Sequence, residues 1–265
     1  MTVFIKSKEE IEKMRISGKL AAEVLEMIEP YIKIGISTEE INDICHQYII
    51  NEQKAIPACL NYHGFPKSIC TSVNDVVCHG IPNKKVILKN KDIINIDVTI
   101  IKNGFYGDTS KMFIVGEKTN KTKKICKIAQ KSLYLALKII KPGIKLNAIG
   151  ETIQKFVENH KYSVVREYCG HGIGKKFHEE PQILHYQSND NQLILKKGMT
   201  FTIEPMINAG HHNVFLMKDG WTVKTQDHSL SAQYEHTLGV TKYGCEIFTI
   251  RKEEIPYISP KLFNL

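Results

Sequence analysis

Apolar residues recur every three or four positions in two segments of the first fifty residues. Each segment opens with a capping-box pattern, Ser7 with Glu10 and Ser37 with Glu40, and the first one ends at Pro30. The apolar positions expected to face the core are Ile11, Met14, Ala21, Leu25 and Ile28 in the first segment and Ile41, Ile44, Cys45, Tyr48 and Ile49 in the second. The pattern predicts two amphipathic helices.

The same order of elements returns in the second half of the chain. A helical stretch, KICKIAQKSLYLALKII, is followed by a break at Pro142-Gly143 and by a second helical stretch, whose apolar positions are Ile149, Ile153, Phe156 and Val157. The motif CHGI parallels GHGI, and IINIDV parallels TFTIEP. The repeat predicts the α+β class, with two pseudo-twofold-related halves (roughly 1–115 and 116–265) whose helices pack on a central antiparallel sheet. No linker rich in Pro, Gly or Ser separates the halves, so we expect one domain spanning 1–265.

A β-hairpin signal lies at Asn103-Gly104, between two runs of β-forming residues. Asp97 and Asp108 interrupt these runs, although Asp is disfavoured in strands. With a two-residue loop, Asp108 pairs with Thr99. Asp97 then lies on the same face of the sheet, in the next pair along that face. A four-residue loop makes the two acids face each other, and a three-residue loop places them on opposite faces. Because two carboxylates about 4 Å apart repel by roughly 4 kcal/mol at an effective dielectric constant near 20, we expect a cation between them.

The second half carries two acids in apolar surroundings that predict strands, Glu204 in GMTFTIEP and Glu235 in SAQYEHTLGV. The repeat aligns Glu204 with Asp97, so two acids from each half would meet at the pseudo-twofold axis. Four carboxylates with one or two histidines and no thiolate form a hard oxygen and nitrogen ligand set, which suits Mn, Fe, Co or Zn. We therefore predict a hydrolytic site with two divalent ions roughly 3.5–4 Å apart, bridged by carboxylates.

Three histidines, His79, His171 and His178, lie in Gly-rich loop contexts where backbone can approach a ligand closely. Their spacing leaves open whether each one binds metal or hydrogen-bonds the substrate. The other histidines lack such a context and are expected to be surface or structural residues; they are His46, His63, His160, His185, His211, His212, His228 and His236.

Composition and charge add few constraints. Hydrophobic residues make up 42% and charged residues 24% of the 265 positions, which is ordinary for a globular protein. No apolar run approaches the length of a membrane span or a secretory signal, so we expect a soluble, cytoplasmic protein without membrane contact. The seven cysteines are odd in number and form no CxxC pair, which argues against a disulfide framework and a thiolate zinc site. The net charge of +8 could mark a polyanion-binding surface, but the lysines are spaced as on the solvent face of helices, so we expect no specific DNA binding.

Five motifs, in order and in register along essentially the whole chain, resemble the bacterial-type (type I) methionine aminopeptidases. They are YHGFPKSICTSVNDVVCHGIP, NIDVTIIKNGFYGDTSKMF, REYCGHGIGKKFHEEPQI, GMTFTIEPMINAG and SAQYEHT. The resemblance implies the pita-bread (creatinase/aminopeptidase-like) fold, which agrees with the internal repeat. It also implies a monomeric, metal-dependent aminopeptidase that removes the N-terminal methionine from nascent proteins when the second residue is small.

The resemblance further assigns roles to individual residues. In this family the positions matching Asp97, Asp108, His171, Glu204 and Glu235 bind two divalent metal ions. Asp108 and Glu235 would bridge these ions, a metal-bridged water or hydroxide would attack the carbonyl after the first methionine, and Glu204 would shuttle the proton. His79 and His178 would contact the scissile amide and stabilise the developing charge.

The family's methionine pocket is apolar, and soft, polarisable contacts suit a thioether. The matching positions are Cys59, Tyr62, Phe65, Cys70, Phe177 and Trp221. The family often has Tyr where this chain has Phe65, for which we expect a small effect on KM. Backbone around Asn74 and Val76, together with Ser231, is expected to bind one monovalent cation.

Two alternative functions stay open from the sequence. An Xaa-Pro aminopeptidase or dipeptidase of the same fold would usually carry a separate N-terminal domain, for which this chain has no room. A non-catalytic pita-bread binding module would be expected to lack metal ligands, whereas all five are present. A transient ribosome contact is a hypothesis that rests on the positive charge and on the family's nascent-chain substrates. Because the affinity order of metals differs from their availability in cells, Co, Mn, Fe and Zn all stay candidates.

Overall fold

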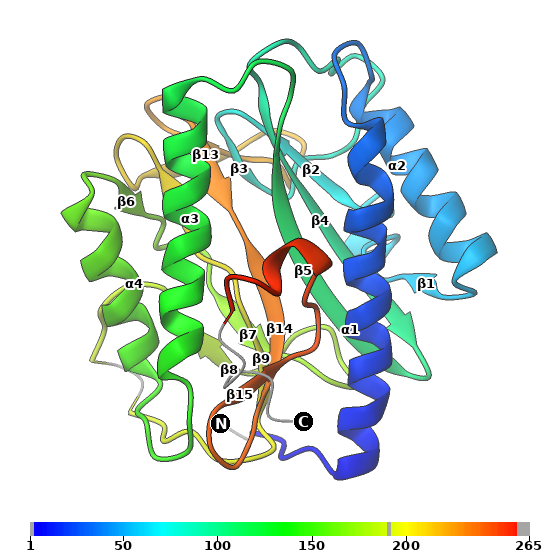
Figure 1. Cartoon of the computed structure of the whole chain (residues 1–265). Helices are drawn as coiled ribbons and strands as arrows, with labels where there is room; N and C mark the ends of the chain where they lie inside the picture. Colours follow the sequence, from blue (N-terminus) through cyan, green and yellow to red (C-terminus); the bar gives the residue numbers. More distant parts are fainter. Residues whose placement is uncertain (1–2, 190–191, 259–265) are drawn as a thin grey trace.

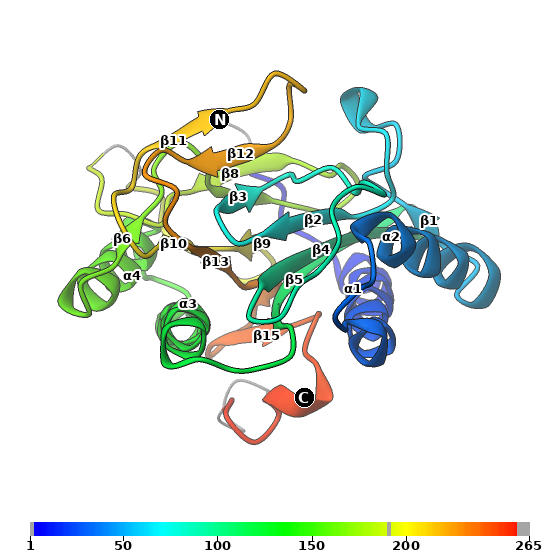
Figure 2. The same cartoon turned by 90° about the horizontal axis from the view of Figure 1, so that it is seen from above.

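Four long helices lie along one side of a twisted sheet in the computed structural model, which describes residues 3–189 and 192–258 (Figures 1 and 2). The helices are α1 (Lys8–Ile28), α2 (Thr38–Gln47), α3 (Asn120–Ile139) and α4 (Asn147–Asn159), and the shorter turns are the 3-10 segments Glu29–Tyr31, Tyr62–Gly64 and Lys252–Glu254 and the π-helical segment Tyr48–Glu52. Both predicted capping boxes are present, at Ser7 with Glu10 and at Ser37 with Glu40. Within the described ranges, no helix has the length and apolar character needed to cross a membrane. The ends of the predicted domain, 1–2 and 259–265, lie outside the described residues.

The strands form one large sheet and two small ones. The large sheet contains β1 (Ile56–Pro57), β2 (Cys70–Val73), β4 (Ile93–Lys102), β5 (Phe105–Ile114), β7 (Gly170–Gly172), β8 (Glu179–Ile183), β9 (Thr200–Ile203), β14 (Glu235–Val240) and β15 (Cys245–Ile247). The small sheets contain β13 (Ser231–Gln233), β10 (Met206–Asn208) and β6 (Ser163–Val164), and β11 (Val214–Leu216), β12 (Val223–Thr225) and β3 (Val76–Cys78). Among the described residues the large sheet runs β1-β4-β5-β14-β9-β7-β8, and its pairings are antiparallel. First-half strands therefore meet second-half strands where β5 pairs with β14.

This arrangement confirms the predicted α+β class with helices on a central antiparallel sheet. One apolar cluster joins α1 and α2 to the first-half strands, and another joins α3 and α4 to the second-half strands. Figure 2 shows the two helix pairs side by side on the same side of the sheet. The two halves thus repeat the same packing, as the sequence repeat predicted.

The hairpin of β4 and β5 has the two-residue loop, one of the three lengths that the sequence allowed. Lys102 pairs with Phe105 across Asn103-Gly104. Both loop residues have positive φ, 53° and 76°, as a tight turn of this type requires. In this register Asp108 pairs with Thr99, and Asp97 lies on the same face of the sheet, in the next pair along that face.

Close packing of α1 on β5 holds this hairpin beside the helices. A Cβ on Gly107 would lie 2.4 Å from the backbone nitrogen of Gly18, so the two backbones approach too closely for a larger residue. The Ser17 hydroxyl donates to the carbonyl of Phe105 at 2.9 Å. The residue after Gly107 is Asp108, so this contact fixes the strand at a predicted site residue.

Candidate metal centre

The predicted acids lie on the face of the sheet that is turned away from the helices. Ile96 and Val98 belong to the apolar cluster under α1 and α2, so Asp97 between them points to the opposite face. Tyr234, directly before β14, and Leu238 on β14 pack into the other helix-side cluster, so Glu235, which follows Tyr234, points away from it. Strand alternation therefore brings acids from both halves together.

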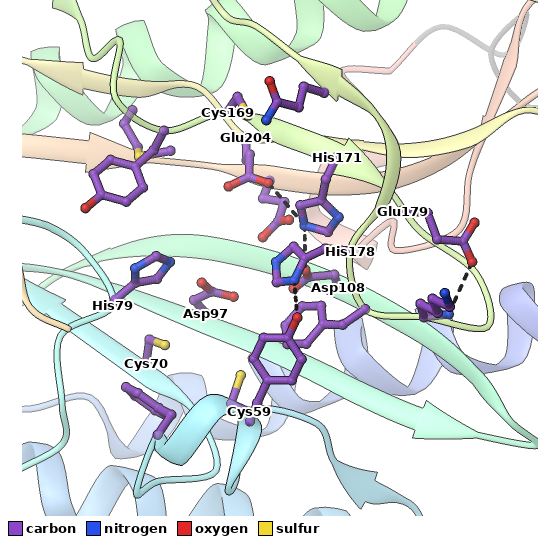
Figure 3. A pocket seen from close by; sticks show the side chains of 18 of the residues that line it. Cys59, Cys70, His79, Asp97, Asp108, Cys169, His171, His178, Glu179 and Glu204 are labelled. Atoms are coloured by element: carbon purple, nitrogen blue, oxygen red, sulfur yellow. Dashed lines mark hydrogen bonds and ion pairs between the residues drawn. The ribbon is translucent and has the colours of Figure 1, made fainter. Parts of the chain in front are cut away.

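One ligand atom from each of Asp108, His171 and Glu235 lies within 4.8 Å of the others. The Nε2 atom of His171 is 3.6 Å from Asp108 Oδ2 and 3.6 Å from Glu204 Oε1. Nδ1 of His171 donates to the carbonyl of Gly172 at 3.0 Å. In a neutral imidazole this leaves the lone pair on Nε2, aimed at the acids, which is the arrangement of a metal-binding histidine (Figure 3).

Threonine hydroxyls orient two of the carboxylates. Thr99 donates to Asp108 Oδ1 at 2.7 Å, and Thr202 donates to Glu204 Oε1 at 2.8 Å. The Thr202 hydroxyl also accepts the backbone N–H of His171 at 3.0 Å. The side chains are thus held by neighbours on β4 and β9.

The acids repel one another strongly in this buried setting. Burial, then Asp108, raises the pKa of Asp97 and of Glu235 well above the ordinary values. Burial raises the pKa of Glu204 to about 7, with His171 opposing the shift. Burial alone would lower the pKa of His171, but Asp108 and Glu204 outweigh it and raise that pKa. Buried carboxylates that face one another in this way are stabilised by cations, so the residues present fit divalent metal binding.

A cavity of about 680 Å³ opens over the acids. Its lining includes all five predicted metal ligands, both histidines predicted to contact the substrate, and all the predicted methionine-pocket residues. Its apolar part consists of Cys59, Phe65 and Cys70 with Phe177 and Trp221 packed against them. The predicted pocket residue Tyr62 lies against Phe177, with ring centroids 4.8 Å apart, and also lines the cavity. The structure therefore brings the apolar pocket and the acid cluster into one space.

His79 and His178 lie on the same cavity without belonging to the cluster of three. His79 has a positive φ of 54°, and its ring meets Tyr168 edge-on at 5.5 Å. Nδ1 of His178 is 2.6 Å from the Tyr62 hydroxyl. Burial lowers the pKa of His79, and burial together with His171 lowers that of His178 to about 4. Both rings are therefore neutral at pH 7, and each keeps one N–H to donate.

The secondary structure predicted around two site residues, His171 and Glu204, was wrong. His171 lies within strand β7 and not in a loop, because its flanking glycines let the strand pair closely on both sides. A Cβ on Gly172 would lie 2.2 Å from the carbonyl oxygen of Glu180. Glu204, expected inside a strand, follows the last residue of β9.

Two further groups support the cavity. His185, predicted to be a surface or structural residue, is structural: it is fully buried, and its Nε2 accepts the backbone N–H of Glu204 at 3.1 Å. Lys6 and Glu179 form an ion pair at 2.5 Å, and both side chains are only 5% exposed. The pair anchors the turn that carries His178. These partners are far apart in sequence, so no local pattern marks them.

The predicted monovalent-cation residues are neighbours. The backbone N–H of Ser231 donates to the carbonyl of Asn74 at 2.8 Å, and Val76 begins β3 two residues later. The Ser231 hydroxyl is buried and has no hydrogen-bond partner within the described part of the chain. The monovalent-cation site at these residues stays a prediction.

Metal-free protein should lose stability as the pH rises, through Glu204. Its folded pKa is about 7 against an ordinary value of 4.5, so between these values the native state binds more protons than the unfolded state. The free energy of unfolding then falls with rising pH. We expect the melting temperature of metal-stripped wild type, relative to that of Glu204→Gln, to fall from pH 5 to pH 7.5. Added Mn²⁺ should remove the difference, because it binds the ionised ligand. A difference that does not vary with pH would contradict the shift.

The chain belongs to metallopeptidase family M24, whose family model matches residues 12–242. Within that family it belongs to the methionine aminopeptidases. It is 64% identical to the methionine aminopeptidase of Escherichia coli K12, over 97% of this chain and 98% of the relative. It is 63% identical to that of Buchnera aphidicola from Acyrthosiphon pisum, over the full length of both.

Solved structures show the same fold. The crystal structure of methionine aminopeptidase from Rickettsia prowazekii superposes with a TM-score of 0.91 at 54% identity, covering 94% of this chain and 100% of that one. The prolidase from Pyrococcus furiosus matches with a TM-score of 0.72 at 22% identity, covering 94% of this chain and 66% of that one. The second likeness bears on the fold alone.

Proposed function

We propose that the protein removes the N-terminal methionine from nascent polypeptides whose second residue is small. The observation that carries this proposal is the single cavity in which an apolar, sulfur-lined pocket adjoins a cluster of acids and histidine. Cys59 and Cys70 offer polarisable contacts to a thioether, and Phe65 with Trp221 closes the pocket, their ring centroids 5.2 Å apart. An unbranched methionine side chain suits this space.

Two divalent ions, Co, Mn, Fe or Zn, would be held by Asp97, Asp108, His171, Glu204 and Glu235, with Asp108 and Glu235 as the bridging ligands. When bound, two such metal ions supply a Lewis acid for the scissile carbonyl and an activated water as nucleophile. The resemblance implies that His171 is the histidine ligand, and the position of its Nε2, which faces the acids, supports this role.

The chain's own residues would bind the amide and move the proton. His79 and His178 are neutral donors on the cavity and would hydrogen-bond the scissile amide as its charge develops. Glu204 would accept the proton of the attacking water at a carboxylate oxygen and pass it to the leaving amine. Tyr62, at 2.6 Å from His178, would keep that ring oriented.

The remaining features of the proposal concern context. We expect one catalytic domain over 1–265, acting as a monomer in the cytoplasm, with transient ribosome contact through its basic surface. Asn74, Val76 and Ser231 would hold one monovalent cation. The Phe65 side chain lacks the hydroxyl that relatives often have there, and the expected consequence is a small change in KM with the same reaction.

Peptide cleavage by metal-stripped protein, with Mn, Co, Fe or Zn added back and products read by mass spectrometry, tests the function. The substrates are Met-Gly, Met-Ala, Met-Lys, Leu-Gly and Ala-Pro peptides of equal length. We expect metal-dependent loss of Met from the Met-Gly and Met-Ala peptides only. Cleavage of Ala-Pro would instead support an Xaa-Pro enzyme, and no cleavage with any metal would support a binding module.

A further inference from the structure

A fully buried charged network lies behind the two predicted bridging acids, on the helix side of the sheet. Arg251, Glu254 and His236 are each 0% exposed. Arg251 donates through Nη2 to Glu254 Oε1 at 2.7 Å, and His236 Nε2 is 3.2 Å from the same oxygen. His236 directly follows Glu235 on β14, so the network touches the strand at a bridging position.

The hydroxyl of Thr109 links this network to both β5 and β14. Arg251 Nη1 donates to Thr109 Oγ1 at 2.9 Å, and Thr109 Oγ1 donates to the backbone carbonyl of Glu235 at 2.7 Å. Thr109 directly follows Asp108 on β5. The hydroxyl accepts from the guanidinium and donates to the carbonyl, so Arg251 fixes the direction in which Thr109 bonds.

A second threonine holds the peptide groups of Asp108 from the opposite strand. Thr237 Oγ1 accepts the backbone N–H of Asp108 at 3.1 Å and donates to its carbonyl at 2.7 Å. Thr237 is itself tied down, because its backbone N–H donates to Thr249 Oγ1 at 3.1 Å. At the seam of the two halves, threonine hydroxyls therefore bond the backbone of both Asp108 and Glu235.

We propose that Thr109, oriented by Arg251, and Thr237 are positioning residues that set the separation of the Asp108 and Glu235 carboxylates. The inference rests on the proposed function, in which these two acids bridge the ions. Two-metal chemistry requires ions at a short, fixed separation. Groups behind metal ligands typically change metal affinity or activity by about 10- to 100-fold when removed. The two hydroxyls act on the backbone, so their loss shifts a carboxylate without removing it.

The test is isothermal titration of Mn²⁺ into the metal-stripped full-length protein, comparing Thr109→Val with Thr109→Ser. Valine keeps the shape and β-branching of threonine but lacks the hydroxyl, whereas serine keeps the hydroxyl. We expect Thr109→Val to bind Mn²⁺ at least about tenfold more weakly than wild type, and Thr109→Ser to stay within about threefold. Thr152→Val is the matched control, because it removes a hydroxyl that donates to the Ala148 carbonyl in α4.

The outcomes separate this inference from the proposed function. Wild type that binds no divalent ion would overturn both. Wild type that binds Mn²⁺ while Thr109→Val binds it equally well would overturn the inference alone, as would an equal loss in the valine and serine variants. If Thr109→Val does not fold, judged by the melting temperature of the metal-free protein, Thr237→Val and Thr237→Ser replace the pair under the same criteria.

Discussion

Asp108→Ala should lower kcat by at least about a hundredfold. Asp108 is 4% exposed, and one of its carboxylate oxygens lies within 4.8 Å of the ligand atoms of both His171 and Glu235. In the proposed site it would contact both ions, so its loss would remove the bridge and with it the stabilisation of the transition state. Removal of one charge-stabilising group in a preorganised site costs on the order of 10²–10³ in kcat. Glu235→Ala should behave in the same way.

Steady-state kinetics with saturating Mn²⁺, together with the metal content of the dialysed protein, measures this effect. Asp43→Ala serves as the control, because Asp43 is an exposed acid on α2 away from the cavity. It should keep wild-type kcat and metal content. Retention of more than about a tenth of wild-type kcat by Asp108→Ala would contradict the bridging role.

Glu254→Ala should lower the free energy of unfolding by about 3–5 kcal/mol. Glu254 is fully buried and accepts hydrogen bonds from Arg251 and from the Tyr134 hydroxyl, at 2.7 and 2.6 Å. Burial alone would raise its pKa, but His236 and Arg251 hold that pKa well below the ordinary value. Removing the carboxylate leaves the Arg251 guanidinium buried without its partner, which is far costlier than losing a surface pair.

Urea denaturation of the metal-free protein measures this loss, and Glu117→Ala is the matched control. Glu117 pairs with Lys91 at 3.1 Å, but these side chains are 62% and 51% exposed. The control should change the free energy of unfolding by less than about 1 kcal/mol. If the free energy of unfolding falls by a similar amount in both variants, the buried pair contributes no more to stability than the exposed one.

The helices and the central hairpin could be predicted because their signals are local. Ser7 with Glu10 caps α1 within one turn, and Asn103-Gly104 closes the hairpin of β4 and β5. The sequence did not decide the length of this loop, since the residues around the turn fit a loop of two, three or four residues. The positive φ of both loop residues, together with the pairing of Lys102, decides the length in the folded chain.

The acid cluster could be predicted because the repeat aligns Glu204 with Asp97 and so relates acids that lie far apart in sequence. The roles of the histidines and the methionine pocket were expected only from the family resemblance. The groups behind the site carry no such signal. Lys6 meets Glu179 across 173 residues, and Arg251 meets Thr109 across 142 residues. Such contacts depend on how the whole sheet closes, which local propensity does not specify.

The most direct test of the metal centre is anomalous diffraction from crystals of the protein grown with Mn²⁺. We expect two anomalous peaks roughly 3.5–4 Å apart, lying between the carboxylates of Asp108 and Glu235, with one of them beside His171 Nε2. No peak between these two carboxylates, or a single peak in fully loaded crystals, would contradict the proposed dinuclear centre.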